Sequence, residues 1–445
     1  MIAFVSLFLG LVIGPRPVTV TASGPVAAVE LLLDGAPAAR IEQKPWTARV
    51  DFGPELAPHE LVARALDAKG HEIARARQWL NLPRPAAEMS ILLQRDQNGI
   101  ATGAQLSWAS LQPGPPAALS VTFDGRPLAV RGVESFPIPA YDGGSTHLLS
   151  ALAEFGNGIH CRADAVLGGR SSMETGSELT AIAVRLDPAA ALPAPAALEG
   201  WITRKRAPLR AVGVERSGAQ VLVVRDLSTA EALSRLGRGG RTIIQPGRRG
   251  TLPVFDSEAL RLELRLGDDD RIRFIWPSVR SVATTSGPAE LFESSHEFRG
   301  RDAGLHWLLT RISHPGKPDP ERRYADATAV AGLQAVQSCT RRAVLLVLGR
   351  KPVDASRHAP ATVRAYLERI HVPLFVWSLE PVPAGETSAW GLVEDVSDLA
   401  KLRAAAERLK TDLASQAIVW VEGQHLPQEI ALTEKAVGME LVRAR

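Results

Sequence analysis

Cysteine is scarce in this sequence. The 445 residues include only Cys161 and Cys339, which lie far apart and form no CxxC pair. Neither a zinc site nor a disulfide framework can be read from this pattern. Because two thiols are compatible with any compartment, cysteine usage does not indicate where the protein resides.

A strong charge of either sign is also lacking. Lys and Arg total 51 against 48 for Asp and Glu, a formal net charge of +3. This bias is too weak to indicate a nucleic-acid-binding protein. Hydrophobic residues make up 45% and charged residues 22%, which excludes both a disordered chain and a polytopic membrane protein. The length suggests about three domains.

Local catalytic signatures are missing too. The chain contains no GxSxG, HExxH, GxxxxGK[ST] or GxGxxG motif, so the usual local signals for nucleophilic, zinc and nucleotide chemistry are absent. We therefore expect a protein that is not an enzyme. The alternative is an active site whose Asp, Ser and His come together from distant loops.

The N-terminus carries an apolar run. Residues 2–14 read IAFVSLFLGLVIG, and no charged residue appears before Arg16. The run is too short to span a bilayer but has the length of a signal-peptide core. A buried first strand is the alternative, although strand-like alternation starts only at Val18. We therefore expect a signal-like segment at 1–14, no transmembrane span, and export to the periplasm or the extracellular space.

An internal repeat follows this segment. VELLLDGAPA, which starts at Val29, matches LSVTFDGRPL from Leu119, and HELVARA from His59 matches HLLSALA from His147. In each copy an alternating strand enters an Asp-Gly turn, where Gly tolerates a positive φ. A repeat of about 90 residues is typical of a small antiparallel sandwich. We predict two all-β immunoglobulin-like sandwiches, at 15–87 and 88–177.

The second half of the chain has a different pattern. The stretch DPAAALPAPAAL at 187–198 cannot continue a strand ladder and indicates an extended connector. We place a strand-rich lead-in and linker at 178–216 and one α/β domain at 217–445. In that domain helical patterns alternate with strands, which is typical of a mostly parallel sheet covered on both faces. The strands are expected at 220–226, 271–276, 343–348, 372–377 and 417–421.

The segments RRAVLLVLG, VRAYLERIHVPLFVWSL and LASQAIVWVEG, in this order, resemble a von Willebrand factor A domain. The chain is similar to the VWFA-related proteins exported by many soil and environmental bacteria, in which strand-rich segments precede the A domain. VELLLDGAPAARIEQKPWTARVDFG is similar to their immunoglobulin-like front domain, and the resemblance runs from about Val18 to Glu429. It implies a doubly wound, Rossmann-like A domain and is evidence for fold rather than for activity.

The resemblance also implies a metal-ion-dependent adhesion site at the carboxyl end of the sheet. The family builds it from an Asp-x-Ser-x-Ser loop, a later Thr and an Asp after a central strand, because Mg²⁺ takes six oxygen ligands. Here Asp226 and Ser228 fill the first two places, the third is Ala230, and Arg350 and Lys351 follow the central strand in place of the acid. We expect a degenerate site without a cofactor, which Mg²⁺ could occupy only if a rearranged acid rescued it. As an alternative role, Asp226 and Ser228 would cap the next helix.

Basic residues are expected to line the rim of this edge. Arg280, Arg350 and Lys351 fall in loops that follow strands, and such loops form the crevice of open α/β sheets. Their charge would favour direct contact with an acidic protein partner. We therefore expect a non-catalytic, exported protein-binding or scaffold protein. A metal-dependent adhesin that keeps Asp226 and Ser228 as ligands is the further alternative to an enzyme.

Overall fold

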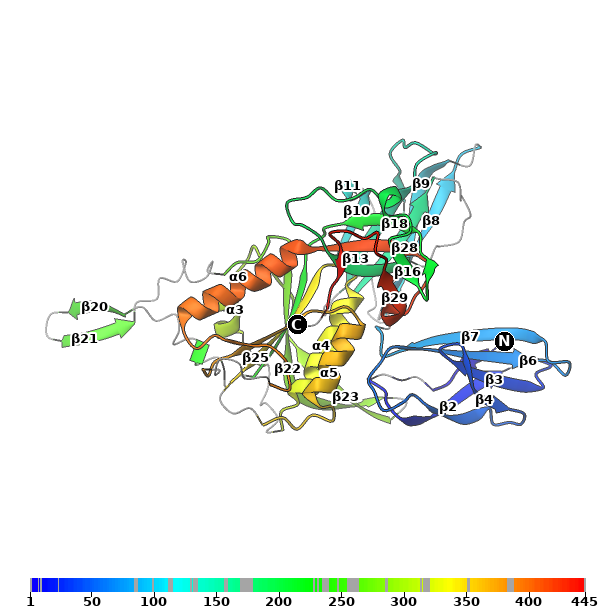
Figure 1. Ribbon diagram of the computed structural model, residues 1–445, viewed down its shortest axis with the longest axis horizontal. Coiled ribbons are helices and arrows are strands. Elements are labelled where there is room, and N and C mark those ends of the chain that lie inside the picture. The colour runs from blue at the N-terminus through cyan, green and yellow to red at the C-terminus, as the bar shows by residue number, and fades with distance from the viewer. Residues whose placement is uncertain are drawn as a thin grey trace.

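The chain folds into β-rich modules beside one body that contains the helices (Figure 1). The computed structural model describes residues 2–443 except 7, 9, 23, 84–86, 98–99, 111–114, 129, 131–134, 156–158, 169–178, 227–228, 230–231, 234–239, 246–247, 254–263, 285–286, 313, 315–320, 350–352 and 382–387.

The first module is an antiparallel sandwich. Its strands are β1 Ile2–Phe4, β2 Pro15–Ala22, β3 Ala28–Leu33, β4 Ala36–Ile41, β5 Thr47–Asp51, β6 His59–Leu66 and β7 Glu72–Leu80. One sheet has the order β1-β2-β5 and the other β4-β3-β6-β7. Both contribute apolar side chains to a single core. This is the two-sheet arrangement of an immunoglobulin-like module.

The second module repeats that topology. Its strands are β8 Ala87–Arg95, β9 Ala101–Ser110, β10 Ala118–Phe123, β11 Arg126–Leu128, β12 Phe136–Pro137, β13 His147–Phe155 and β14 Ile159–Leu167. They form the sheets β12-β9-β8 and β11-β10-β13-β14. Each strand takes the same place as its counterpart in the first module, so the all-β part of the prediction is confirmed.

The repeat extends to individual polar contacts. Asp34 and Asp124 both have a positive φ, of 52° and 48°. The carboxylate of Asp34 contacts Nδ1 of His59 at 2.7 Å, and Asp124 contacts His147 at the same distance. Each aspartate also accepts a hydrogen bond of 2.8 Å from the backbone amide that follows its histidine. The Asp-Gly turn is thus tied to the start of the sixth strand in both modules.

The apolar N-terminal segment belongs to the first module. Strand β1 pairs antiparallel with β2, and Val12 is 5% exposed in the same core. Ile2 of β1 and Val12 therefore contribute to the core, as the alternative of a buried first strand expects, and the signal-like role of 1–14 stays a prediction. An apolar sequence by itself does not show whether its side chains are buried in a protein core or in a membrane. Export stays a prediction.

A third β module is built from two distant parts of the chain. Its strands are β15 Leu179–Arg185, β16 Ile202–Arg204, β17 Ala207–Pro208, β18 Ala211–Glu215, β28 Gln416–Glu422, β29 Ile430–Leu432 and β30 Glu440–Leu441. They form the sheets β18-β28-β15-β30 and β17-β16-β29. The α/β body between β18 and β28 is therefore an insertion into this module.

Two expectations fail at this module. The strand predicted at 417–421 for the parallel sheet is β28, which pairs antiparallel with β15 and β18 instead. Both of its faces are buried, so its continuous apolar sequence looks like that of a parallel-sheet strand. The predicted connector at 187–198 contains the 3₁₀ turn Pro195–Leu198, and Leu198 is fully buried in the module's core.

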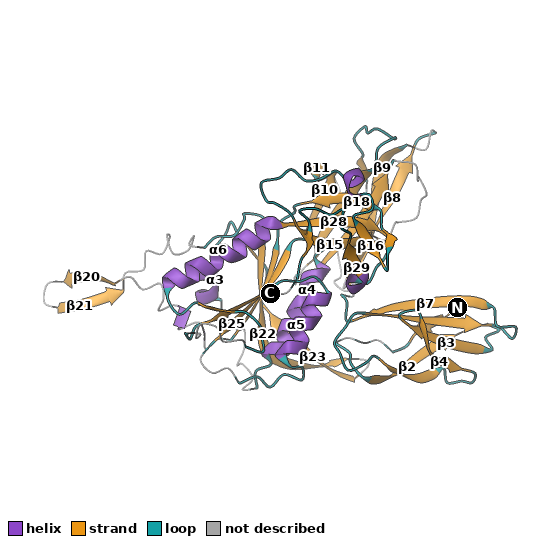
Figure 2. Cartoon of the chain, in the orientation of Figure 1, coloured by secondary structure: helices purple, strands orange, loops and turns teal. Residues whose placement is uncertain are grey.

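The inserted body is a mostly parallel sheet between helices (Figure 2). Its sheet has the order β23-β22-β19-β25-β26-β27, in which only β23 is antiparallel to its neighbour among these six strands. Helices α4 and α5 pack on one face, and α3 and α6 pack on the other. The strand bounds are β19 Gln220–Arg225, β22 Arg271–Thr284, β23 Gly287–Ser294, β25 Arg342–Leu348, β26 Leu374–Ser378 and β27 Val393–Asp395. The helix bounds are α3 Leu305–Arg311, α4 Tyr324–Gln337, α5 Pro360–Arg369 and α6 Leu399–Ser415.

Two small elements lie beside this sheet. Strand β24, Phe298–Arg299, pairs with β22. Strands β20 Gly240–Gln245 and β21 Arg248–Pro253 form a hairpin of their own, which projects from the body (Figure 1).

The modules contact one another through specific side chains. Leu56 of the first module is fully buried against the α4 and α5 face of the body. The hydroxyl of Tyr366 in α5 donates to the carbonyl of Asn81 at 2.9 Å. Between the second and third modules, the guanidinium of Arg162 lies 4.0 Å from the ring centroid of Trp420 and donates to Glu215 at 2.8 Å. These contacts indicate a fixed arrangement of modules.

Replacing Leu56 by Ala should loosen the first module from the body. Because the side chain is fully buried between them, the loss should cost about 2–4 kcal/mol. Differential scanning calorimetry should then resolve an early transition for the first module. The control Ile73→Ala removes a side chain that is 44% exposed in the same module and should change little. An unchanged thermogram for Leu56→Ala would contradict this interface.

Candidate functional site

The sheet order points to the carboxyl end of β19. The chain runs from β19 to β22 and β23 on one side and then returns to β25, β26 and β27 on the other, so the strand order reverses at β19. A crevice forms where this reversal occurs in an open parallel sheet. Asp226 comes directly after β19 at this point and is 3% exposed.

The carboxylate of Asp226 is engaged by an arginine. Its Oδ2 lies 2.6 Å from Nη1 of Arg322, a residue just before α4. Tyr324 lies beside both groups, and burial, reinforced by the Asp226 charge, raises the pKa of its hydroxyl above the usual value. The tyrosine therefore stays protonated. A guanidinium and a phenol thus surround the carboxylate that the sequence suggested as a metal ligand.

Backbone hydrogen bonds hold Arg322 in place. The amide of Ala355 donates to the carbonyl of Arg322 at 2.8 Å. On the other side, the amide of Arg323 donates to the carbonyl of Pro277 at 2.8 Å. The segment is therefore fixed between the loop after β25 and strand β22, so its guanidinium is directed at Asp226 by the fold.

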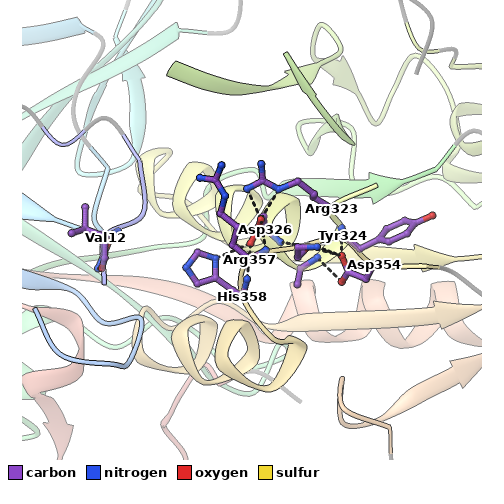
Figure 3. Close-up of polar contacts among 10 residues, drawn as sticks. Val12, Arg323, Tyr324, Asp326, Asp354, Arg357 and His358 are labelled. Carbon is purple, nitrogen blue, oxygen red and sulfur yellow. Dashed lines mark hydrogen bonds and ion pairs between the residues drawn. The ribbon is translucent and has the colours of Figure 1, made fainter. Parts of the chain in front are cut away.

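A second carboxylate lies at the start of α4, where Figure 3 shows Asp326 between arginine and histidine side chains. Asp326 accepts hydrogen bonds from Nε of Arg323 and contacts Nδ1 of His358, both at 2.7 Å. Asp354 accepts from the first amides of α4, those of Tyr324 at 3.0 Å and Ala325 at 3.2 Å. The loop after β25 thereby caps this helix.

The electrostatics of Asp326 favour its charged form. Burial by itself raises the pKa of this carboxyl, but the hydrogen bonds from His358, the Arg357 amide and Arg323 outweigh it, so the pKa falls well below the usual value. A carboxylate with such a low pKa is a poor general base at neutral pH. The arrangement stabilises structure rather than supplying acid–base chemistry.

The structure describes only some of the predicted site residues. Asp226 is described, whereas Ser228, Ala230, Arg350 and Lys351 lie outside the described residues. Arg280 was expected in a rim loop, but it lies inside β22, which continues past Trp276 because β23 folds back and pairs with it. Its side chain is 72% exposed and 3.9 Å from Glu293.

Sequence reasoning missed Arg322, Tyr324, Asp326 and His358. The available signal was the Arg-Arg-Tyr sequence directly before the helical pattern at 326–336. The neighbouring Arg225 points to the opposite face of the sheet, where Cζ of its guanidinium lies 5.4 Å from the ring centroid of Trp276 on the α3 and α6 side.

Other constellations of the described residues were also considered for chemistry. The imidazoles of His59, His147 and His358 each contact an aspartate rather than a serine. Within the described ranges, no group of three or more His, Cys, Asp and Glu side chains could hold a metal ion. No helix in the described part of the chain is long and apolar enough to cross a membrane.

Comparison with family profiles and with curated protein sequences finds no match to the chain. Among solved structures, the fibronectin(III)-like modules of Clostridium thermocellum CbhA are 19% identical, with 18% of this chain and 93% of that chain covered and a TM-score of 0.17. The central fibronectin-III array of RIM-binding protein is 10% identical, with 44% and 81% covered and a TM-score of 0.20. The human COPII-coat protein Sec24c is 8% identical, with 52% and 44% covered and a TM-score of 0.25.

Changing Asp326 to Asn should lower stability by roughly 3 kcal/mol at neutral pH, because it removes the buried charge that holds Arg323 and His358. The folded-state pKa of Asp326 is depressed from 3.8, so its stabilisation is fully present above about pH 4 and is lost as the pH falls further. The gap between wild type and Asp326→Asn should therefore shrink below pH 4 in calorimetric scans. The exposed control Asp269→Asn should follow the wild type at every pH. A gap independent of pH would show that the charge is not the cause.

Proposed function

We propose that the α/β body is a von Willebrand A-type domain in which an internal ion pair replaces the metal-ion-dependent adhesion site. The whole chain is then a non-catalytic, exported protein-binding or scaffold protein. The sheet supports this proposal, because its strands in chain order run 3-2-1-4-5-6, the doubly wound order with a ligand crevice beside the first strand. Asp226 follows that first strand directly.

The contact of 2.6 Å between Asp226 and Arg322 carries the proposal. A divalent cation at this place would need oxygen ligands and would be repelled by a fixed guanidinium. The arginine neutralises the buried carboxylate without leaving a coordination position open to a partner. The described residues therefore do not fit Mg²⁺, and binding at this edge proceeds without a bridging cation.

The partner is proposed to be a protein with an acidic face. Arg280 is exposed on the β22–β23 hairpin, and Arg350 and Lys351 follow β25 in the sequence. Cations at the rim attract carboxylates directly and give an interaction that weakens with salt. The three β modules, joined through Leu56 and Arg162, would hold the body in a fixed orientation toward such a partner.

Calorimetry with millimolar Mg²⁺ should give no heat of binding with the wild-type protein. The matched variant Asp226→Ala should behave identically. Heat in the wild type that vanishes in Asp226→Ala would establish a metal-dependent adhesin and overturn this proposal. Turnover of a hydrolase or transferase substrate would favour the enzyme alternative instead.

A mutant cycle tests the ion pair itself. Arg322→Met should destabilise the protein by roughly 3–5 kcal/mol, because it leaves the carboxylate of Asp226 buried without its counter-charge. Adding Asp226→Asn should restore much of that loss, since the unpaired carboxylate is then gone. Equal and additive losses, measured by urea unfolding, would show that the two side chains are not coupled.

Reversing the rim charges should weaken binding to an acidic probe. With poly-glutamate as the probe, the double change Arg350→Glu and Lys351→Glu should lower affinity and flatten its salt dependence. EDTA should have no effect. The control Arg40→Glu, an exposed change in the first module, should bind as the wild type does. Binding abolished by EDTA and unaffected by the reversal would replace direct contact with a metal bridge.

A further inference from the structure

Arg225, the last residue of β19, is buried with fewer hydrogen-bond partners than its guanidinium can use. Arg225 is fully buried, and its side chain lies on the sheet face opposite Asp226. Nη2 donates to the carbonyl of Ile312 at the end of α3, at 2.5 Å. The other two nitrogens, Nε and Nη1, have no hydrogen-bond partner in the described part of the chain. Buried donors of this kind normally have an acceptor.

The indole of Trp276 presents another such donor nearby. Trp276 is 1% exposed, and its Nε1 also lacks a hydrogen-bond partner among the described residues. Its ring centroid lies 5.4 Å from Cζ of Arg225. Two independent side chains, from adjacent strands, therefore bring unpaired donors into one apolar surrounding. Both donate, so the missing group is an acceptor.

The charges around Arg225 do not balance. Asp226 is the counter-charge that acts on Arg225, but its carboxylate is already paired with Arg322. These three residues together carry one net positive charge at the end of the strand. Burial lowers the pKa of Arg225 to about 10, which still leaves it protonated at neutral pH. An uncompensated buried cation is strongly unfavourable unless an anion accompanies it.

We propose that a small monovalent anion binds between Arg225 and Trp276. Nε and Nη1 of the guanidinium and Nε1 of the indole supply its hydrogen bonds, and the guanidinium supplies the charge. The nearest acid along β23, Glu293, lies 3.1 Å from Nε2 of His314, whose ring packs against Trp276. That acid is therefore within ion-pair distance of an imidazole and is hydrogen-bonded to neither Arg225 nor Trp276. A halide or a carboxylate of formate size can accept from this donor set, and gluconate, a much larger anion, is the reference in the test below.

Thermal unfolding in different sodium salts tests the site. At constant ionic strength, replacing gluconate by bromide should raise the melting temperature of the wild-type protein, and the rise should saturate. Arg225→Met should abolish this response, and Trp276→Phe, which removes only the indole donor, should weaken it. The control Arg273→Met removes a guanidinium from the same strand as Trp276, one whose Nη2 donates to Ser294, and should keep the full response. An equal bromide effect in all variants would overturn the proposal.

Crystals of the wild-type protein soaked in bromide give a direct measurement. Anomalous scattering should place bromide within hydrogen-bond reach of Nε1 of Trp276 and the guanidinium of Arg225. If Arg225→Met does not fold, Trp276→Phe and this measurement still decide the question. No bromide peak at this place, together with a melting temperature independent of the anion, would show that the chain compensates Arg225 by itself.

Discussion

The carboxylate of Asp226 ends the central strand of the parallel sheet inside the protein, where an unpaired charge is strongly unfavourable. Arg322 supplies the counter-charge at 2.6 Å, and the segment that carries it is fixed to Pro277 and Ala355. The start of α4, the loop after β25 and strand β22 meet at this ion pair. The shape of this edge depends on one buried ion pair.

The carboxylates at this edge are engaged by groups of the chain itself. Asp326 and Asp354 engage Arg323, His358 and the first amides of α4, so these carboxylates are already used by the chain itself. On the function proposed above, what the edge would offer to another molecule is positive charge. An adhesion site instead presents a metal cation held by acids, and both arrangements attract a carboxylate.

Three β modules accompany the α/β body, and one of them contains it as an insertion. The two sandwiches share strand order and the Asp–His contact at their Asp-Gly turns, which indicates one structural unit used twice. The third module is interrupted by the body, so both ends of the body are anchored in one sheet by β18 and β28. An insertion held at both ends moves less freely than a domain on a single linker.

The sequence by itself determined the elements whose signals are local. Alternation, the Asp-Gly turns and the 90-residue repeat specified the two sandwiches, and apolar strands between helical patterns specified a parallel sheet, because these periodicities follow from backbone geometry. Tertiary structure decided which sheet receives β28, since a strand buried on both faces carries the same apolar pattern in either sheet. It also decided that Arg322 meets Asp226. That contact joins residues far apart in the chain, and no local pattern encodes it.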